Sequence, residues 1–175
     1  MPRLAIAAVL ALAATPAFAM DLTSPDVTDG ATFATKFVCA KFGGSSISPA
    51  LAWTGVPATA KSLAVTMFDP DAGTTGFWHW LAADIPLGTT GLAQGAGAMG
   101  KMPAGTTALP NGARQASYAG PCPPPGKPHH YQITVYALPV AKADVTPIMK
   151  AADIGAWLDK NAIDKARITP IYAAK

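Results

Sequence analysis

The sequence predicts an all-β dominated fold, an antiparallel β-sandwich with one small helical segment near the C-terminus. Short apolar runs are separated by clusters of proline and glycine, which supply 17 and 16 of the 175 residues. Both residues interrupt regular structure and favour turns, so the chain reads as many short strands. Helix signals occur only in the C-terminal part, whereas strand–helix–strand repeats would place helices throughout. These two observations favour a sandwich of antiparallel sheets.

Four segments before the helical part are predicted to form strands. Ser62–Phe68 is apolar on both faces, as expected for a strand in the middle of a sheet, and Trp80–Ile85 is similar. Polar and apolar residues alternate along Tyr131–Leu138, which is typical of a strand with one face in the core. Thr32–Val38 is a shorter and only partly apolar candidate.

The helical segment is predicted to begin at Thr146-Pro147 and to continue to Ala166. Threonine is a good N-cap, and proline is favoured in the first turn because the amides of that turn have no intrahelical partner. Gly155 is expected to weaken or divide the helix. Ile168–Tyr172 then reads as a short strand, and its proline would place it at the edge of a sheet.

Gly88–Gly112 contains seven glycines and no hydrophobic periodicity. A loop of this length is unusual in a compact domain, and such loops are often functional. We therefore expect a surface loop that contributes to the rim of a binding pocket. Since the chain has no internal repeat and no sign of a second domain, residues 20–175 are predicted to form a single domain.

Residues 1–19 have the pattern of a secretory signal peptide. Arg3 is the only charged residue before Asp21, and an apolar run follows it from Leu4 to Ala14. The run is shorter than the roughly 20 residues that a membrane span needs, so a cleaved signal is favoured over an anchor. Ala17–Ala19 has the small-x-small pattern of a cleavage site. We expect a mature chain that begins at Met20 and a periplasmic or secreted protein of a bacterial-type cell.

The charge and hydropathy patterns support neither nucleic-acid binding nor a membrane span. The net charge is +3, and no basic run or stripe occurs. Binding to nucleic acid therefore has no electrostatic support. After the N-terminal segment, no apolar stretch is long enough for a membrane span.

The chain has two cysteines, Cys39 and Cys122. An even number of cysteines in an exported protein favours a disulfide, while two buried free thiols are the alternative. The two residues are not in a Cys-x-x-Cys arrangement, so a thiol-redox enzyme is not expected. A bridge would hold the segment near Cys39 against the proline-rich turn around Cys122.

Asp69 and Asp71 directly follow the predicted strand Ser62–Phe68. Residues two apart in an extended chain share a face, so the two carboxylates are expected to point the same way. His79 lies between two tryptophans, and in a strand both indoles would face one side and the imidazole the other. Each feature also has an ordinary explanation, because Asp-Pro-Asp is common in turns and a lone histidine of this kind is usually a core residue.

His129 and Tyr131 repeat the two-residue spacing after the proline-rich turn Gly120–Pro128. They are predicted to share a face, which leaves His130 on the opposite, solvent-facing side. Combined with the acidic pair and His79, they suggest one concave site of two carboxyls, two imidazoles and a phenol.

The ordered motifs of the chain resemble those of the phosphatidylethanolamine-binding proteins, in particular their bacterial Raf-kinase-inhibitor-like branch. The resemblance spans roughly residues 32–138 and rests on paired segments in the family's order. These are the segments Ser48–Trp53, Asp69–Asp71, Trp78–Trp80, Tyr118–Pro124 and His129–Tyr131. The stretch Ala113–Ser117 departs from the Asn-Asp-Phe-Gly-type segment common in the branch, which affects the expected rim of the pocket.

The resemblance implies a β-sandwich with a small anion pocket at one end. By position in the motifs, the pocket would be lined by Asp69, Asp71, His79, Pro123, His129 and Tyr131. The expected ligand is a small anionic or phosphorylated molecule, including a phospholipid headgroup. No cofactor and no metal are expected, and the protein partner and oligomeric state stay open.

The expected function is ligand binding without catalysis by an exported protein. One alternative is a protein-interaction or inhibitor module that uses the mouth of the pocket. Another is a hydrolase that uses the Asp and His residues with a metal or as acid–base groups. The chain has neither a His-Glu-x-x-His metal motif nor a Gly-x-Ser-x-Gly nucleophile motif, which disfavours the hydrolase.

An anion beside two carboxylates needs compensation, because like charges 4 Å apart cost about 4 kcal/mol at an effective dielectric constant of 20. Protonated His79 and His129, a protonated carboxyl, a carboxylate turned toward backbone amides, or a zwitterionic ligand would each supply it. We therefore expect phosphate or phosphoethanolamine to bind more tightly near pH 5.5 than near pH 8.

Overall fold

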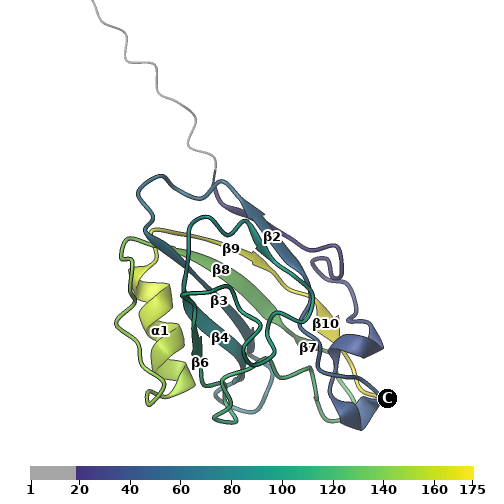
Figure 1. Ribbon diagram of the computed structural model, residues 1–175. Helices are drawn as coiled ribbons and strands as arrows, with labels where there is room; N and C mark the ends of the chain where they lie inside the picture. The colour runs from purple at the N-terminus through teal and green to yellow at the C-terminus, as the bar shows by residue number, and fades with distance from the viewer. Residues whose placement is uncertain (1–18) are drawn as a thin grey trace, which may run out of the picture.

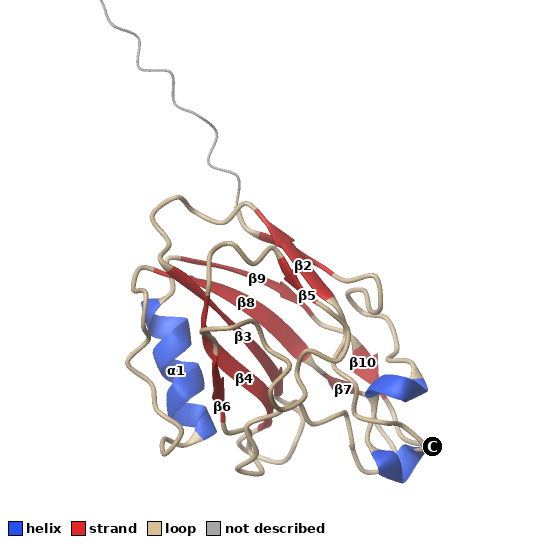
Figure 2. Ribbon diagram, in the orientation of Figure 1, coloured by secondary structure: helices blue, strands red, loops and turns tan. Residues whose placement is uncertain are grey.

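The computed structural model describes residues 19–175, which form mainly antiparallel strands and one α-helix near the C-terminus (Figures 1 and 2). The predicted fold class is confirmed, whereas all of the predicted signal peptide except Ala19 lies outside the described residues. In chain order the elements are β1 (Asp21–Thr23), η1 (Thr35–Phe37), η2 (Ala40–Phe42), β2 (Leu51–Thr54), β3 (Ser62–Asp69), β4 (Phe77–Ile85), β5 (Gly91–Leu92), β6 (Thr107–Leu109), β7 (His129–His130), β8 (Gln132–Leu138), α1 (Ala151–Asn161), β9 (Asp164–Ile168) and β10 (Ile171–Tyr172).

The largest sheet has the strand order β6-β4-β3-β8-β9, with β3 in its centre. β3 is buried along most of its length because β4 and β8 pair with its two edges and other elements cover both of its faces. Its continuous apolar run predicted this central place. The antiparallel register sets Val65 opposite Ala82 on one side and Val135 on the other.

The main core fills the space between this sheet and the smaller sheet β1-β2-β5. Met67, Trp80 and Ile133 from the large sheet pack in one cluster with Leu22 and Trp53 from the small one. Each such side chain contributes about 1.5–3 kcal/mol when it is buried. The two facing sheets make this part of the molecule a sandwich (Figure 2).

Helix α1 covers the other face of the large sheet (Figure 1). Its buried residues Ile154 and Leu158 pack in a second cluster with Leu81 and Leu138 of the sheet. The helix is shorter than predicted. Thr146 starts only a turn, in which its carbonyl accepts from Met149, and the helix proper follows Lys150.

The end of the helix also differs from the prediction, because residues 164–168 form strand β9 instead of helix. β9 pairs with β8 along its whole length, so its backbone amides find partners in the sheet. Gly155 does not divide the helix either. Its position is buried, and a Cβ there would lie 2.1 Å from the Trp78 ring.

Two further predicted strands change their character. In Thr32–Val38, residues Thr35–Phe37 form the 3-10 turn η1, and the buried Phe33 and Phe37 are four residues apart rather than alternating. The segment Ile168–Tyr172 is shared between two sheets. Ile168 ends β9, while β10 pairs with β7 in a separate two-stranded sheet.

The glycine-rich segment 88–112 contains the short strands β5 and β6, which extend the small and the large sheet respectively. The prediction of one long loop was therefore wrong at both ends of the segment. Period-two patterning cannot be recognised in strands of two or three residues.

Residues 19–175 contain no helix that combines the length and the apolarity needed to cross a bilayer.

Candidate functional site

A pocket of about 380 Å³ lies where β3 ends and β4 begins, beneath the proline-rich turn. Its lining residues come from the turn after β3, the start of β4, the proline-rich turn and β7. They are Asp69, Asp71, Ala72, Gly73, Phe77, His79, Cys122, Pro123, Pro124 and His129. A second hollow of about 260 Å³, between α1 and the large sheet, contains none of the predicted site residues.

Asp69 organises the centre of the pocket. It is the last residue of β3, and only 2% of its surface is exposed. One carboxylate oxygen, Oδ1, accepts the backbone N–H of Asp71 at 2.9 Å, which closes the turn after the strand. The other, Oδ2, lies 2.7 Å from Nδ1 of His129 and 3.9 Å from Nε2 of His79. A single buried carboxylate thus joins three separate segments of the chain.

His79 reaches the pocket through an irregularity in β4. Met67 lies opposite Trp80 and Phe68 lies opposite Trp78, so His79 has no partner across the ladder. The extra residue sends the two indoles to different clusters, Trp80 into the main core and Trp78 toward α1. The prediction that both tryptophans share one face was wrong, because a bulge shifts the alternation by one residue.

The buried ring of His79 is neutral near pH 7. Burial lowers its pKa below the ordinary value of 6.5, and this outweighs the opposing effects of the Ala119 hydrogen bond and of Asp69. Nδ1 lies 2.9 Å from the carbonyl oxygen of Ala119, which can only accept, so Nδ1 carries the hydrogen. Nε2 is then an unprotonated acceptor 3.9 Å from the Asp69 carboxylate, and the two groups do not form an ion pair. A hydrogen placed between these two acceptors would satisfy both.

His129 is the second buried imidazole of the pocket. It lies in β7, and its Nδ1 donates to the carboxylate of Asp69. With Nδ1 fixed in this way, Nε2 is the atom left to contact a ligand. β7 is held in place by its pairing with β10, where Tyr172 lies opposite His129.

Asp71 occupies the rim rather than the centre. Its side chain is 40% exposed, against 3% for Asp69. Its Oδ2 accepts from both the backbone N–H and Nδ1 of His130, at 2.7 and 2.8 Å. The side-chain bond from His130 is the main cause that lowers the pKa of Asp71 below its usual value. Both aspartates line the pocket, and each contacts its own histidine.

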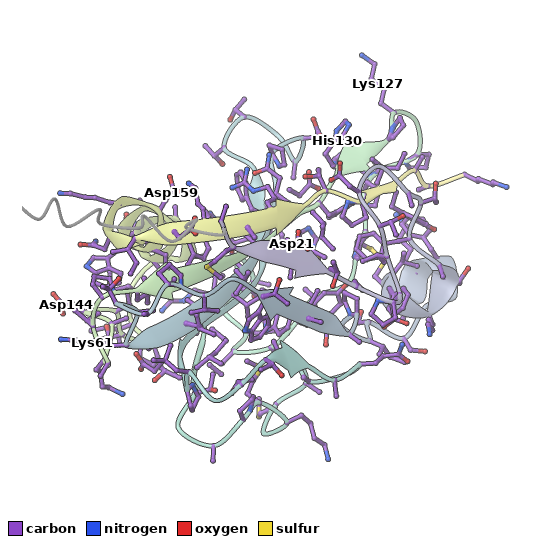
Figure 3. The ribbon with its side chains drawn as sticks, turned by 90° about the horizontal axis from the view of Figure 1, so that it is seen from above. Asp21, Lys61, Lys127, His130, Asp144 and Asp159 are labelled. Atoms are coloured by element: carbon purple, nitrogen blue, oxygen red, sulfur yellow. A yellow bond between two sulfur atoms is a disulfide. The ribbon has the colours of Figure 1, made fainter. Side chains whose placement is uncertain are left out.

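The pair between Asp71 and His130 was missed by the sequence reasoning, which assigned His130 to solvent alone. Its ring is 55% exposed and also bonded to the rim. Figure 3 shows His130 and Lys127 toward one end of the molecule, with Lys61 and Asp144 toward the other. The only signal was the parallel spacing of two aspartates and two histidines, which does not by itself reveal a contact.

Tyr131 lies behind the pocket rather than on its wall. It is fully buried, and its ring packs edge-on against His79 with 5.3 Å between the ring centres. Among residues 19–175 its hydroxyl has no hydrogen-bond partner. Burial, aided by the nearby Asp69, raises the pKa of this phenol, so the hydroxyl keeps its hydrogen. Tyr131 thus presents an unpaired donor next to His79.

The proline-rich turn forms the opposite wall. Pro123 and Pro124 line the pocket beside Cys122, and Cys122 forms a disulfide with Cys39, with 5.5 Å between their Cα atoms. The predicted bridge is present in the structure. The backbone N–H of Cys39 also donates to the carbonyl of Pro121, so the turn is fastened twice.

Phe77 and the small residues of the turn after β3 were not predicted to line the site. The Phe77 ring contacts His79 edge-on, with 4.8 Å between ring centres, and gives the pocket an apolar side. No lysine or arginine is among the residues that line the pocket. No lining residue of any type comes from segment 88–112. The expectation that this segment forms the rim was therefore wrong.

Within the described part of the chain, no three histidine, cysteine, aspartate or glutamate side chains form a group that could hold a metal ion. Asp69 is committed to His129, and the Nδ1 atoms of His79 and His129 are both engaged.

Known proteins are similar to this chain in sequence and in fold. The family model described as phosphatidylethanolamine-binding protein matches residues 23–173. YbcL of Escherichia coli K12 is 40% identical over 183 residues, which cover 100% of both chains. The lipoprotein LppC of Mycobacterium tuberculosis is 41% identical over 135 residues, covering 74% of this chain and 62% of its own.

Two solved structures extend the comparison. The crystal structure of E. coli YbcL, described as a new member of the mammalian PEBP family, has a TM-score of 0.85 and 41% identity, and covers 89% of this chain and 99% of its own. A phosphatidylethanolamine-binding protein homologue from Chlamydia trachomatis has a TM-score of 0.74 and 28% identity, and covers 90% and 99% of the two chains. The chain belongs to the phosphatidylethanolamine-binding protein family, in the bacterial branch that includes YbcL.

Proposed function

We propose that the protein is exported and binds a small phosphate-bearing ligand in the pocket around Asp69 without transforming it. The observation that carries the proposal is the meeting of Asp69, His79 and His129 in a pocket of about 380 Å³, although they come from segments up to 60 residues apart. Membership of the phosphatidylethanolamine-binding protein family supports an anionic headgroup as the ligand class.

The charges of the pocket restrict the form of the ligand. Its ionisable lining residues are two aspartates and two histidines, and one of these imidazoles is neutral near pH 7. A bare dianion would meet unfavourable potential there. A dihydrogen phosphate or phosphomonoester monoanion brings its own acidic hydrogen, which can bridge Nε2 of His79 and the Asp69 carboxylate. The ammonium of phosphoethanolamine would add attraction to Asp71 at the rim.

Binding should therefore be coupled to protons. The pKa of His79 is low in the free protein, and a bound anion would favour the imidazolium and raise that pKa. Binding then takes up a proton, so affinity increases as the pH falls from 8 to 5.5. Calorimetry with phosphoethanolamine and inorganic phosphate tests this dependence, and an affinity that is flat or increases with pH contradicts it.

Sulfate separates the two possible sources of the proton. It stays a dianion over this pH range, so any pH dependence of sulfate binding comes from the protein. We expect sulfate to bind more weakly than phosphate at pH 7, because it cannot supply the bridging hydrogen. Matched substitutions His79→Asn and His129→Asn should weaken binding, whereas His130→Asn, outside the lining, should change it less than twofold.

Non-catalysis and export each have their own test. A phosphoesterase screen of the wild type and His79→Ala should find no turnover in either, and activity that vanishes in the variant would favour the acid–base hydrolase. Export is supported by the N-terminal pattern, the disulfide and the name of the related lipoprotein LppC. Fractionation of cells that express the full chain should find the protein outside the cytoplasm.

A further inference from the structure

The first residues of the described chain meet an acidic side chain that forms no ion pair in the described part of the chain. The backbone nitrogen of Met20 lies 3.0 Å from Oδ2 of Asp164, at the start of β9. Ala19 is exposed, whereas Met20 is only 7% exposed and belongs to the main core. The core therefore begins at the residue that follows the expected cleavage site.

We propose that, once the signal peptide has been removed, this contact is an ion pair that fastens β1 to β9. Hydrolysis of the Ala19–Met20 peptide bond by a signal peptidase uses one water molecule. It leaves a carboxylate on Ala19 and an ammonium on Met20. An α-amino group ordinarily has a pKa of about 7.7–8.0, so it is mostly protonated at pH 7. The mature chain then offers a cation to Asp164 where the precursor offers an amide.

The hydrogen bonds and ion pairs around Asp164 leave it available to pair with the Met20 ammonium. Its Oδ1 accepts the backbone N–H of Lys165, which leaves Oδ2 for Met20. The Lys165 ammonium pairs with Asp159 instead, and the Arg167 guanidinium donates to Thr134. No lysine or arginine forms an ion pair with Asp164 in the described part of the chain.

Few other charges face the Met20 nitrogen. β2, which pairs with β1, carries none, and β1 itself adds only the exposed Asp21. Of the residues that line the hollow around Ala19, Asp164 alone is charged. Figure 3 shows β1, with Asp21 labelled, beside β9, so the ammonium would join the small sheet to the edge of the large one.

The same contacts set the order of events. Met20 is buried, and Leu22 is paired with Trp53 in the ladder between β1 and β2. A peptidase needs an extended, accessible chain on both sides of the bond, which the folded domain does not offer. Hydrolysis therefore precedes the docking of β1. A cut one residue away would move the ammonium by about 3.8 Å and lose the contact.

The proposal rests on export but not on the ligand pocket, so the two can fail separately. The full chain is expressed for export, purified, and its first residue determined by N-terminal sequencing and intact mass. The expected mature chain begins at Met20. A chain that begins elsewhere or keeps residues 1–19 overturns the proposal whatever the pocket binds.

The ion pair is then tested by thermal unfolding of the mature chain between pH 7 and 9.5. A carboxylate that stabilises the ammonium raises the pKa of this group in the folded state. Its contribution is fully present below about pH 7.7 and is lost as the pH rises through the folded-state pKa. The wild type should lose about 2–4 °C over this range relative to Asp164→Asn.

Two matched chains complete the test. Asp21→Asn removes a neighbouring acid that does not contact the nitrogen, and its pH slope should equal that of the wild type. A mature chain that starts at Ala19 moves the ammonium away and should behave like Asp164→Asn. If Asp164→Asn and the wild type show the same slope, the contact is an ordinary hydrogen bond and the proposal is wrong.

Discussion

At the scale of single residues, the two buried tyrosines near the site make opposite use of their hydroxyls. Tyr118 donates to the carbonyl of Phe37 at 3.2 Å, whereas the Tyr131 hydroxyl has no partner in residues 19–175. A buried donor without a partner costs about 1–3 kcal/mol. Such a cost means that the Tyr131 hydroxyl does not contribute to stability.

The pair Tyr131→Phe and Tyr118→Phe tests this difference. We expect Tyr131→Phe to have an equal or higher free energy of unfolding and, because Tyr131 does not line the pocket, to keep its affinity for phosphate. Tyr118→Phe should lose about 0.5–1.5 kcal/mol and keep its affinity. Urea unfolding and calorimetry measure both quantities. A large loss of stability in Tyr131→Phe would mean that its hydroxyl has a stabilising partner after all.

The lowered pKa of His79 predicts how the free energy of unfolding depends on pH. In the unfolded chain its pKa is near 6.5, and burial lowers it in the folded protein. The stability contributed by the neutral ring is therefore fully present above pH 6.5 and is lost as the pH falls through the folded-state pKa. Urea unfolding between pH 7 and 5 should show a decrease that is smaller in His79→Asn. Equal slopes for the two proteins would rule out this histidine as the cause.

At the scale of elements, the sequence predicted long strands well and short or irregular ones poorly. The apolar run of β3 and the alternation of β8 are strong signals that tertiary contacts reinforce. The end of α1 was missed because residues 164–168 complete a sheet whose edge the sequence does not reveal. The bulge at His79 depends on how β3 and β4 align, which no local pattern specifies.

Gly155 shows how packing overrides helix propensity. In an exposed helix, replacing glycine with alanine usually stabilises by about 1 kcal/mol. Here the added Cβ would lie 2.1 Å from the Trp78 ring, so α1 or the indole must move. We expect Gly155→Ala to lower the free energy of unfolding by about 1–3 kcal/mol. As a control, Ala152→Gly at an exposed position of the same helix should lower the free energy of unfolding by about 1 kcal/mol through helix propensity alone. A Gly155→Ala variant that is more stable than the wild type would contradict the packing explanation.

At the scale of the whole molecule, the site depends on chain segments brought together by the sheet and the disulfide. The paired spacings and the family motifs predicted that Asp69, His79 and His129 would meet. In the structure both imidazoles lie next to the carboxylate of Asp69. Burial depth could not be predicted. Asp71 lies at the rim and Tyr131 behind the wall, because a two-residue period gives direction but not depth.

The bridge between Cys39 and Cys122 links the wall of the pocket to the segment around η2, 83 residues away in sequence. Closing a loop of this size contributes roughly 4–5 kcal/mol in the chain-entropy model. Reduction, or the double substitution of both cysteines by serine, should lower the melting temperature and also weaken phosphate binding. Unchanged affinity in the folded double variant would mean that the bridge serves stability alone.

A crystal structure of the protein soaked with phosphoethanolamine would show whether this pocket receives a phosphate group beside His79 and His129. We expect phosphate oxygens within hydrogen-bonding distance of Nε2 of at least one of the two histidines, with the ammonium toward Asp71. A pocket without the ligand at a concentration that saturates binding in solution, or a phosphate bound elsewhere on the molecule, would contradict this expectation.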